Sequence, residues 1–216
     1  MGVIKNLLDL IFPPKCVFCG KFLHDEGGGI CRRCQATLPF TEGAGVSRNG
    51  EFFDVCVSPL YYKDNVRKSI LHFKFKGATG NAAAYASILA DCIREQLTGK
   101  YDLISWVPIS ARREKTRGYD QAMLLALATA LELGDVAVET LKKTTDIPAQ
   151  SSLNGAEKRR ANVSGVYTVA DPELITGKHV LLIDDIITTG ATLGECARTL
   201  LMAGAESVVC AALARA

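Results

Sequence analysis

Residues 179–193 form the most informative segment of the chain: His179-Val180-Leu181-Leu182-Ile183-Asp184-Asp185-Ile186-Ile187-Thr188-Thr189-Gly190-Ala191-Thr192-Leu193. The short aliphatic run at its start is typical of a strand buried in a parallel sheet. The run stops at two acids, and a polar turn follows. Apolar residues then recur at helical spacing to about Met202. The expected buried face of this helix is Leu193, Ala197, Leu200 and Leu201.

The turn between the strand and the helix has the chemistry of an anion site. Free backbone N–H groups and the positive end of the helix dipole meet a phosphate there. Threonine hydroxyls add donors, and glycine lets the backbone come close. The acids before the turn suit ribose hydroxyls or a metal-bound water, so a sugar phosphate satisfies both ends. The candidate phosphate ligands are Thr188, Thr189, Gly190, Ala191 and Thr192, and the candidate hydroxyl acceptors are Asp184 and Asp185.

The sequence of this segment has two other interpretations. An apolar run followed by Asp also occurs in Walker B strands, but the chain has no G-x-x-x-x-G-K-[ST], which excludes a P-loop ATPase. Alternatively, Asp185 and Thr189 are ordinary helix caps. That interpretation leaves the Asp-Asp pair at the end of the strand unexplained.

The composition of the whole chain limits the classes of protein. Its 216 residues suggest one or two domains, and 48% hydrophobic residues exclude a disordered tail. A net charge of +2 is too small for a purely electrostatic nucleic-acid binder. No apolar run is long enough to span a membrane. Residues 1–12 resemble a short amphipathic helix more than a signal peptide, so we expect a cytoplasmic protein without a membrane partner.

Two CxxC pairs near the N-terminus predict a structural zinc site. Thiolates in two knuckles can occupy the corners of a tetrahedron around Zn²⁺, leaving no open position for catalysis. A redox CxxC or two disulfides are the alternatives, and Pro13-Pro14 argues against the redox helix. The predicted ligands are Cys16, Cys19, Cys31 and Cys34. The isolated Cys56, Cys92, Cys196 and Cys210 are expected to be buried thiols of a reduced, intracellular protein.

A second strand is expected at residues 101–108, followed by a basic loop over 109–121. Such a loop at the end of a neighbouring parallel strand is where an α/β sheet places a ligand. Its cations Arg112, Arg113 and Lys115 are candidates for binding a pyrophosphate. The alternatives are that the loop is only solvated or that it contacts nucleic acid. A helix from about Gln121 should bury Ala122, Leu125, Ala128 and Leu131.

Further basic residues are candidates for contact with nucleic acid. A helix is expected from about Asn65, with Val66, Ile70 and Phe73 turned inward and lysines extending outward near its end. The candidate contacts are Lys63, Arg67, Lys74, Lys76 and Arg117. Residues 144–152 have no apolar period and are expected to be a polar lid or a linker.

Ile183 to Thr192 resembles the motif that binds phosphoribosyl pyrophosphate (PRPP) in type I phosphoribosyltransferases. In combination with the Cys-rich knuckle, this sequence resembles the ComF family, including its GntX-like members. The segments that carry the family resemblance are Phe73–Gly77, Val107-Pro108, Arg117–Ala122, Gln150, Leu153 and Arg160–Val163. Asp120 stands where the family usually has Asn. The resemblance implies Mg-PRPP, with ribose hydroxyls on Asp184 and Asp185, and a bacterial role in natural competence and single-stranded DNA uptake.

These observations predict an α/β protein, with a type I phosphoribosyltransferase-like parallel sheet flanked by helices over residues 46–216. A small zinc-ribbon-like module is expected over residues 1–45. One hypothesis is an enzyme that transfers the phosphoribosyl group to an unknown acceptor while pyrophosphate leaves toward the basic loop. Amidotransferase relatives use an N-terminal Cys that this sequence does not offer, so glutamine-dependent chemistry is not supported. The second hypothesis is a non-catalytic module that binds single-stranded DNA and a helicase-type competence ATPase.

Overall fold

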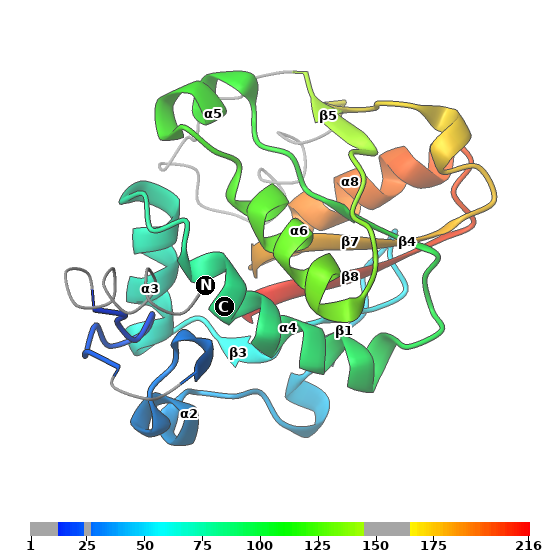
Figure 1. The fold of residues 1–216 in the computed structure, drawn as a ribbon. Coiled ribbons are helices and arrows are strands. Elements are labelled where there is room, and N and C mark those ends of the chain that lie inside the picture. Colours follow the sequence, from blue (N-terminus) through cyan, green and yellow to red (C-terminus); the bar gives the residue numbers. More distant parts are fainter. Residues whose placement is uncertain (1–12, 24–26, 145–164) are drawn as a thin grey trace.

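A computed structural model describes residues 13–23, 27–144 and 165–216. Its centre is a six-stranded sheet with the order β1-β2-β8-β7-β4, and β3 also pairs with β8 (Figure 1). β1 runs antiparallel to β2, and the other pairs are parallel. The strands are β1 Ser47–Arg48, β2 Cys56–Val57, β3 Leu60–Tyr61, β4 Leu103–Trp106, β7 His179–Ile187 and β8 Ser207–Arg215. The predicted α/β fold with a largely parallel sheet is confirmed.

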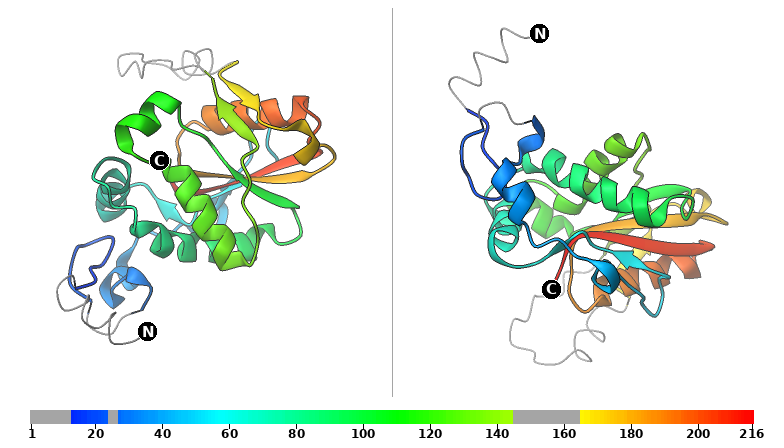
Figure 2. Two further views of the ribbon diagram at one scale, coloured as in Figure 1. Left: turned by 45° about the horizontal axis from the view of Figure 1, so that its top comes forward. Right: turned by 90° about the horizontal axis from the view of Figure 1, so that it is seen from below.

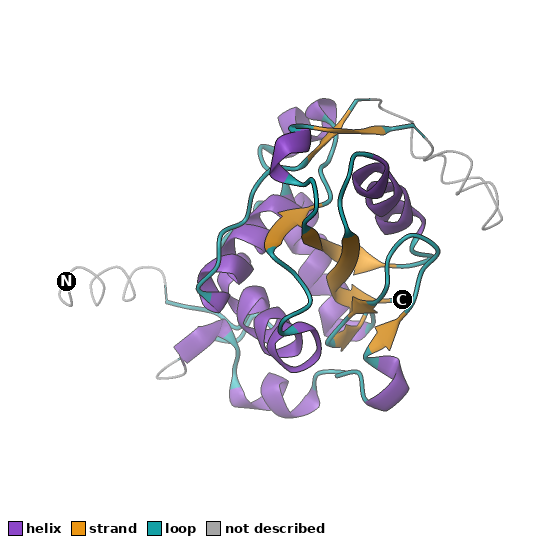
Figure 3. Cartoon of the chain, turned by 90° about the vertical axis from the view of Figure 1, so that its right-hand side faces the viewer, coloured by secondary structure: helices purple, strands orange, loops and turns teal. Residues whose placement is uncertain are grey.

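Helices cover both faces of the sheet, and the central strands explain why. Along β7, Leu181 and Ile183 point to the face covered by α3, α4 and α6. The alternate residues Val180 and Leu182 point to the face covered by α8. Figure 3 shows most of the helices on one side of the strands and a single long helix, α8, on the other. The helices are α2 Arg32–Thr37, α3 Asp64–Phe75, α4 Asn81–Leu97, α5 Ala111–Arg117, α6 Gln121–Leu133 and α8 Ala191–Met202.

Smaller elements complete the chain. Strands β5 Leu141–Lys143 and β6 Tyr167–Val169 form a separate antiparallel pair above the sheet (Figure 2). Short 3₁₀ turns lie at Gly27–Gly29, Gly43–Gly45 and Pro172–Leu174. The helix predicted for residues 1–12 and most of the polar segment 144–152 lie outside the described residues. Within the described part of the chain, no helix has the length and apolar character that crossing a membrane requires.

Two of the predicted helices have the expected buried faces. In α3, Val66, Ile70 and Phe73 are fully buried. In α8, the residues predicted to face inward are buried or half-buried. These faces follow the 3.6-residue period closely, so the sequence pattern alone identified them.

The structure corrects two predictions in the basic middle of the chain. Residues 111–117 form α5 and not a loop, because the Ser110 side chain caps the helix by accepting from the Arg113 N–H at 3.4 Å. Gly118, with φ +84°, ends it. Helix α6 starts at Gln121 as predicted, but Leu131 is 82% exposed. Steps of three residues drift off the 3.6-residue period, so the buried stripe continues through Ala126 and Ala130 instead.

The N-terminal segment packs on α3 and α4 and shares their core. Phe18 lies 5.8 Å from the Tyr85 ring, centroid to centroid. The Ser69 hydroxyl donates to the carbonyl of Val17. Figure 2 shows this segment beside one end of the main domain. The predicted boundary between residues 45 and 46 stays a prediction.

Candidate functional site

The candidate site lies at the carboxyl ends of the parallel strands. Trp106, the last residue of β4, is level with Ile183 on β7, and the Val107 N–H donates to the Ile183 carbonyl at 2.9 Å. Asp184 and Asp185 therefore emerge at the edge where the chain leaves β4 toward α5. The start of α8 follows a few residues later. Parallel strands thus place the acids, the basic helix α5 and the threonine loop at the same edge of the sheet. That these groups bind PRPP stays a prediction.

Asp185 is buried with a lysine against it. It is 3% exposed, and the Lys74 ammonium lies 2.8 Å from its Oδ1. Its other oxygen, Oδ2, is buried without a hydrogen-bond partner among the described residues. A buried acceptor in this state is costly unless a ligand donates to it. The prediction that Lys74 extends outward is wrong, because this carboxylate draws its ammonium inward at the end of α3.

Asp184 lies beside this ion pair in an environment that disfavours its charge. Burial raises the pKa of its carboxyl, the neighbouring Asp185 charge raises it further, and Lys74 acts in the opposite direction. The Asp185 N–H donates to Asp184 Oδ1 at 2.7 Å. The two acids therefore share one lysine, and a ligand with hydroxyl donors would stabilise the charged form of Asp184.

The loop after β7 presents an open helix N-terminus. Gly190 adopts φ +82°, which other residues rarely accept, and as the N-cap residue it has no side chain with which to cap α8. Thr189 Oγ1 accepts from the Ala191 N–H at 3.3 Å. Arg48 braces the loop by donating to the carbonyls of Thr188 at 2.8 Å and Thr189 at 3.3 Å. A cavity of about 410 Å³ borders this turn and includes Arg48. Sequence reasoning missed Arg48, since nothing local connects it to the loop.

The basic helix α5 contributes its cations unequally. Arg113 and Arg117 are half-buried, whereas Arg112 and Lys115 are exposed. Burial lowers the pKa of Arg117, and the nearby Arg113 lowers it further, while Asp185 opposes the shift. Arg113 and Arg117 thus lie within electrostatic range of each other, and Arg117 also lies within electrostatic range of Asp185. The remaining nucleic-acid candidates, Lys63, Arg67 and Lys76, are exposed on or beside α3.

Asp120 has a structural position next to the site. Its Oδ1 accepts from the N–H groups of Ala122 at 2.9 Å and Met123 at 3.1 Å, which caps α6. Its Oδ2 accepts from the Ile109 N–H at 2.9 Å. The side chain thereby ties the segment after β4 to the start of α6. An Asn can make the capping bonds through its carbonyl oxygen but has no second acceptor for Ile109.

The four predicted zinc ligands come together. Their Sγ atoms all lie within 4.8 Å of one another, and Cys19 and Cys31 are 3.6 Å apart. Ligands at about 2.3 Å from a tetrahedral zinc ion are about 3.8 Å from each other, so the cluster fits Zn²⁺. Gly20 turns beneath it with φ +73°.

The electrostatics of the cluster also suit a cation. For Cys16, burial raises the thiol pKa, but backbone N–H groups of Cys31, Cys19 and Phe18 outweigh it and lower the pKa to about 7. Burial and the neighbouring thiols raise the pKa of Cys34. A bound Zn²⁺ would favour all four thiolates and remove this conflict. Outside the cluster, Cys56, Cys92, Cys196 and Cys210 are buried free thiols, as predicted.

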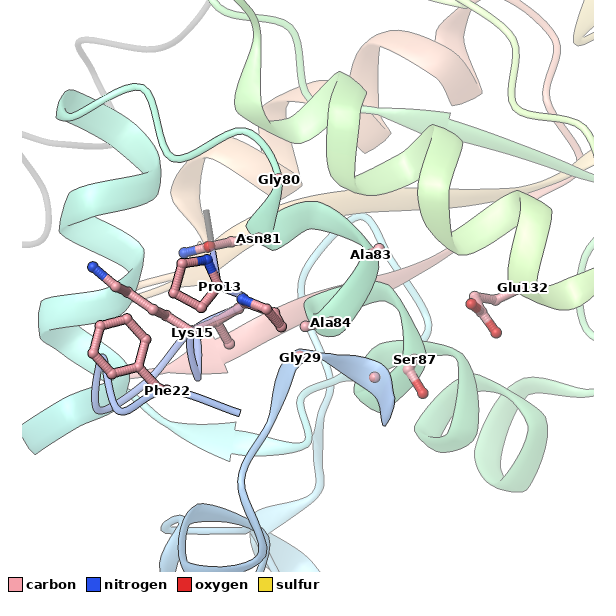
Figure 4. Close-up of a pocket in the computed structure, with 13 residues that line it drawn as sticks. Pro13, Lys15, Phe22, Gly29, Gly80, Asn81, Ala83, Ala84, Ser87 and Glu132 are labelled. Carbon is pink, nitrogen blue, oxygen red and sulfur yellow. The ribbon is translucent and has the colours of Figure 1, made fainter. Parts of the chain in front are cut away.

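A larger cavity than the one beside the phosphate loop lies elsewhere. It has a volume of about 1150 Å³ and lies between the N-terminal segment and α4 (Figure 4). Lys15 and Glu132 are its only ionisable lining residues among those described. The N-terminus of α4 borders the cavity at Gly80 and Asn81, but no carboxylate pair is among the described lining residues. Size alone would select this cavity, but the convergent polar groups are at the end of β7. We therefore place the candidate site there.

Comparisons with known proteins find a matching family for each of the two predicted regions of the chain. The phosphoribosyl transferase domain family matches residues 120–216, and the double zinc ribbon domain family matches residues 7–54. Competence protein ComFC of Bacillus subtilis is 26% identical over 90% of this chain and 74% of its own length. Competence protein F of Haemophilus influenzae is 27% identical over 94% and 97%. DNA utilization protein YhgH of Salmonella typhimurium is 32% identical over 70% and 68%.

Proposed function

Since the chain belongs to the ComF family, with a phosphoribosyltransferase domain and an N-terminal zinc ribbon, we propose that it binds Mg-PRPP at the carboxyl end of β7. The observation that carries this proposal is the buried Asp185, whose Oδ2 has no partner among the described residues. It lies a few residues before the N-terminus of α8, where the N-cap Gly190 has no side chain and Thr189 Oγ1 accepts from the Ala191 N–H. A hydroxyl acceptor next to a phosphate cradle matches the two ends of a ribose phosphate.

Each group at the site has a role in this proposal. Asp184 and Asp185 accept from the ribose hydroxyls, and the loop 188–192 holds the 5-phosphate with N–H and hydroxyl donors. Lys74 compensates one of the two acids, which lowers the repulsion that a highly anionic ligand meets there. Arg113, with Arg112 and Lys115 further out, faces the pyrophosphate. Mg²⁺ bound with PRPP supplies charge neutralisation of the leaving pyrophosphate.

The chemical step that we propose is phosphoribosyl transfer. A nucleophile on the acceptor forms a bond to the anomeric carbon as the bond to pyrophosphate breaks, and pyrophosphate leaves with the electron pair. Release of pyrophosphate in the presence of a candidate acceptor is the readout for this step.

Calorimetry with Mg-PRPP tests the binding site. We expect Asp184→Asn combined with Asp185→Asn to weaken affinity at least about tenfold, because charged hydrogen bonds contribute roughly 1.5–3 kcal/mol each. Asp91→Asn, which removes an acid whose side chain is 70% exposed on α4, should leave affinity unchanged. A parent protein without binding at millimolar PRPP, or a double variant with parental affinity, would contradict the proposal.

A second variant separates loss of the site from loss of the fold. Gly190→Val forces a branched side chain into a φ of +82° at the phosphate loop and leaves both acids in place. It should also weaken PRPP binding, by distorting the turn that presents the N–H groups. Thermal melting of each variant shows whether the sheet is intact.

A second candidate function is the binding of single-stranded DNA. It is favoured by the names of the relatives, which refer to competence and DNA utilization, and by exposed cations on α3 and α5. In this alternative the protein acts as a non-catalytic module of DNA uptake, and a helicase-type ATPase is a possible partner class.

The salt dependence of strand binding tests this alternative. Affinity should fall by about 0.7 log units per phosphate contact for each decade of salt. Arg113→Glu with Lys115→Glu should flatten this slope, whereas Arg94→Glu on α4 should not. Salt-independent affinity, or no binding at low salt, would remove the alternative.

A further inference from the structure

Phe75, at the end of α3, is an aromatic side chain that packing does not explain. It is 60% exposed, although two residues earlier Phe73 is fully buried. The guanidinium carbon of Arg117 lies over its ring, 4.8 Å from the centroid. Planar guanidinium groups stack on aromatic faces, and together the two side chains make a flat, partly apolar and cationic surface.

This surface is held in place from several sides. Arg117 donates to Gln121 Oε1 at 2.7 Å, so its guanidinium is fixed at the start of α6. The Tyr119 hydroxyl donates to the carbonyl of Phe73, which ties the segment after α5 to α3. The Tyr119 and Phe73 rings lie 6.3 Å apart. A surface fixed in this way loses little conformational entropy when a ligand stacks on it.

The same residues connect the surface to the candidate site. Lys74, the neighbour of Phe75, is the residue that pairs with Asp185 at 2.8 Å. The charge of Asp185 acts to raise the pKa of Arg117, so the two side chains lie within electrostatic range of each other. The Phe75 ring and the ribose-hydroxyl acceptor are therefore linked by adjacent residues of one helix, and Figure 1 shows the end of α3 beneath α5.

We propose that Phe75 and Arg117 form a stacking platform for a nucleobase beside the sugar-phosphate site. This inference rests on the proposed function for the position of the ribose, and it adds the class of the group bound next to it. Nucleobases carry a π-face that stacks on aromatic side chains and on arginine. The base comes either from a small nucleotide at the site or from single-stranded DNA, and the experiment separates these sources.

The chain contains a matched control for this platform. Phe22 is 54% exposed, and Lys15 Nζ lies 5.0 Å from its ring centroid. This pair also places a cation over an exposed phenyl ring, although its cation is a lysine ammonium and not a planar guanidinium. It lies in the N-terminal segment and lines the large cavity (Figure 4), whose described lining does not include Asp184 or Asp185. A general affinity of exposed aromatic rings for bases would use both pairs equally.

Two pairs of probes measure the contribution of the base. The first compares AMP with ribose 5-phosphate, and the second compares an oligothymidylate with an abasic strand of equal length. In at least one pair the parent protein should prefer the ligand with a base. Phe75→Leu should reduce that preference about tenfold, and Phe22→Leu should keep it. A change in the first pair identifies a small nucleotide, and a change in the second identifies a DNA strand.

Further measurements keep the result decisive. Phe75→Trp should retain the preference, and its emission should be quenched when the base stacks, which loss of folding would not produce. PRPP has no base, so its affinity for Phe75→Leu reports on the proposed function separately. If the protein prefers ligands with a base but does not bind PRPP, the result would support the stacking platform and contradict the proposed function. No preference in either pair, or equal losses in Phe75→Leu and Phe22→Leu, would overturn the platform.

Discussion

The zinc cluster and the carboxylate site both gather polar groups into a small volume, but the chain builds them in different ways. The four thiols come from residues 16–34, in two knuckles next to each other in the sequence. The carboxylate site takes Lys74 from α3, Arg117 from α5 and its acids from β7. The first is assembled by local turns, whereas the second exists only after the whole sheet has formed.

This difference determines what each site depends on. The thiol cluster fits a structural zinc ion, because four Sγ atoms lie within 4.8 Å of one another and a bound cation would favour their thiolate forms. The acids need a lysine that lies far away in the sequence, because a buried carboxylate is costly without a counter-charge. The zinc region should therefore respond to metal, and the acid region to substitutions in α3.

The largest expected effect is that of zinc removal. Chelation, or Cys34→Ser, should abolish hydrogen-exchange protection over residues 13–38 and leave β7 and β8 protected. Structural zinc sites bind with apparent free energies of about 10–16 kcal/mol, and this energy stabilises the fold around them. The parent should hold one zinc ion per chain, measured by metal analysis. Cys92→Ser, a buried thiol outside the cluster, should keep the zinc, and a protected N-terminal segment without metal would contradict the prediction.

The next effect in size concerns the acid region. Lys74→Met keeps an unbranched side chain only one atom shorter but leaves Asp185 buried without its counter-ion, and we expect a loss of about 3 kcal/mol in the free energy of unfolding. Urea denaturation measures this loss. Combining Lys74→Met with Asp185→Leu should restore most of it, since the uncompensated charge is then gone.

An exposed ion pair provides the comparison for this measurement. Arg94 and Asp91 are also 2.8 Å apart, but their side chains are 48% and 70% exposed. Arg94→Met should therefore change stability by less than about 1 kcal/mol. Equal losses in the free energy of unfolding for Lys74→Met and Arg94→Met would mean that the burial of Asp185 does not increase the cost of losing its counter-ion.

The smallest effect is a difference in pH response. The pKa of Asp184 is raised in the folded protein, by burial first and by Asp185 second. Between the ordinary carboxyl pKa near 4 and this raised pKa, the folded state holds more protons than the unfolded state. Stability from Asp184 is thus complete at low pH and is lost as pH rises through this range. The zinc site behaves oppositely, because acid protonates the thiolates and releases the metal.

Denaturation of the parent and of Asp184→Asn across this pH range isolates the contribution of the carboxyl. Relative to the variant, the parent should lose stability as pH rises. A difference between the two proteins that stays constant with pH would show that Asp184 is not held in its neutral form.

Much of the fold and part of the site follow from local sequence. The strand, turn and helix of residues 179–202 could be predicted because each has its own periodicity and Gly190 marks the turn. The thiol cluster could be predicted because two CxxC pairs fix the spacing of the ligands. In these segments the interacting residues are close in the sequence, so their spacing is enough to predict how they are arranged.

Tertiary structure alone decided the rest. Lys74 resembles any solvated lysine near a helix end, and only the packing of α3 beside β7 turns it toward Asp185. Arg48 braces the phosphate loop, and Arg117 covers Phe75, through contacts between distant segments. Leu131 belongs to an apolar pattern yet lies on the exposed side of α6. Periodicity shows which residues share a face, but the charge or surface opposite that face is fixed only when the chain has folded.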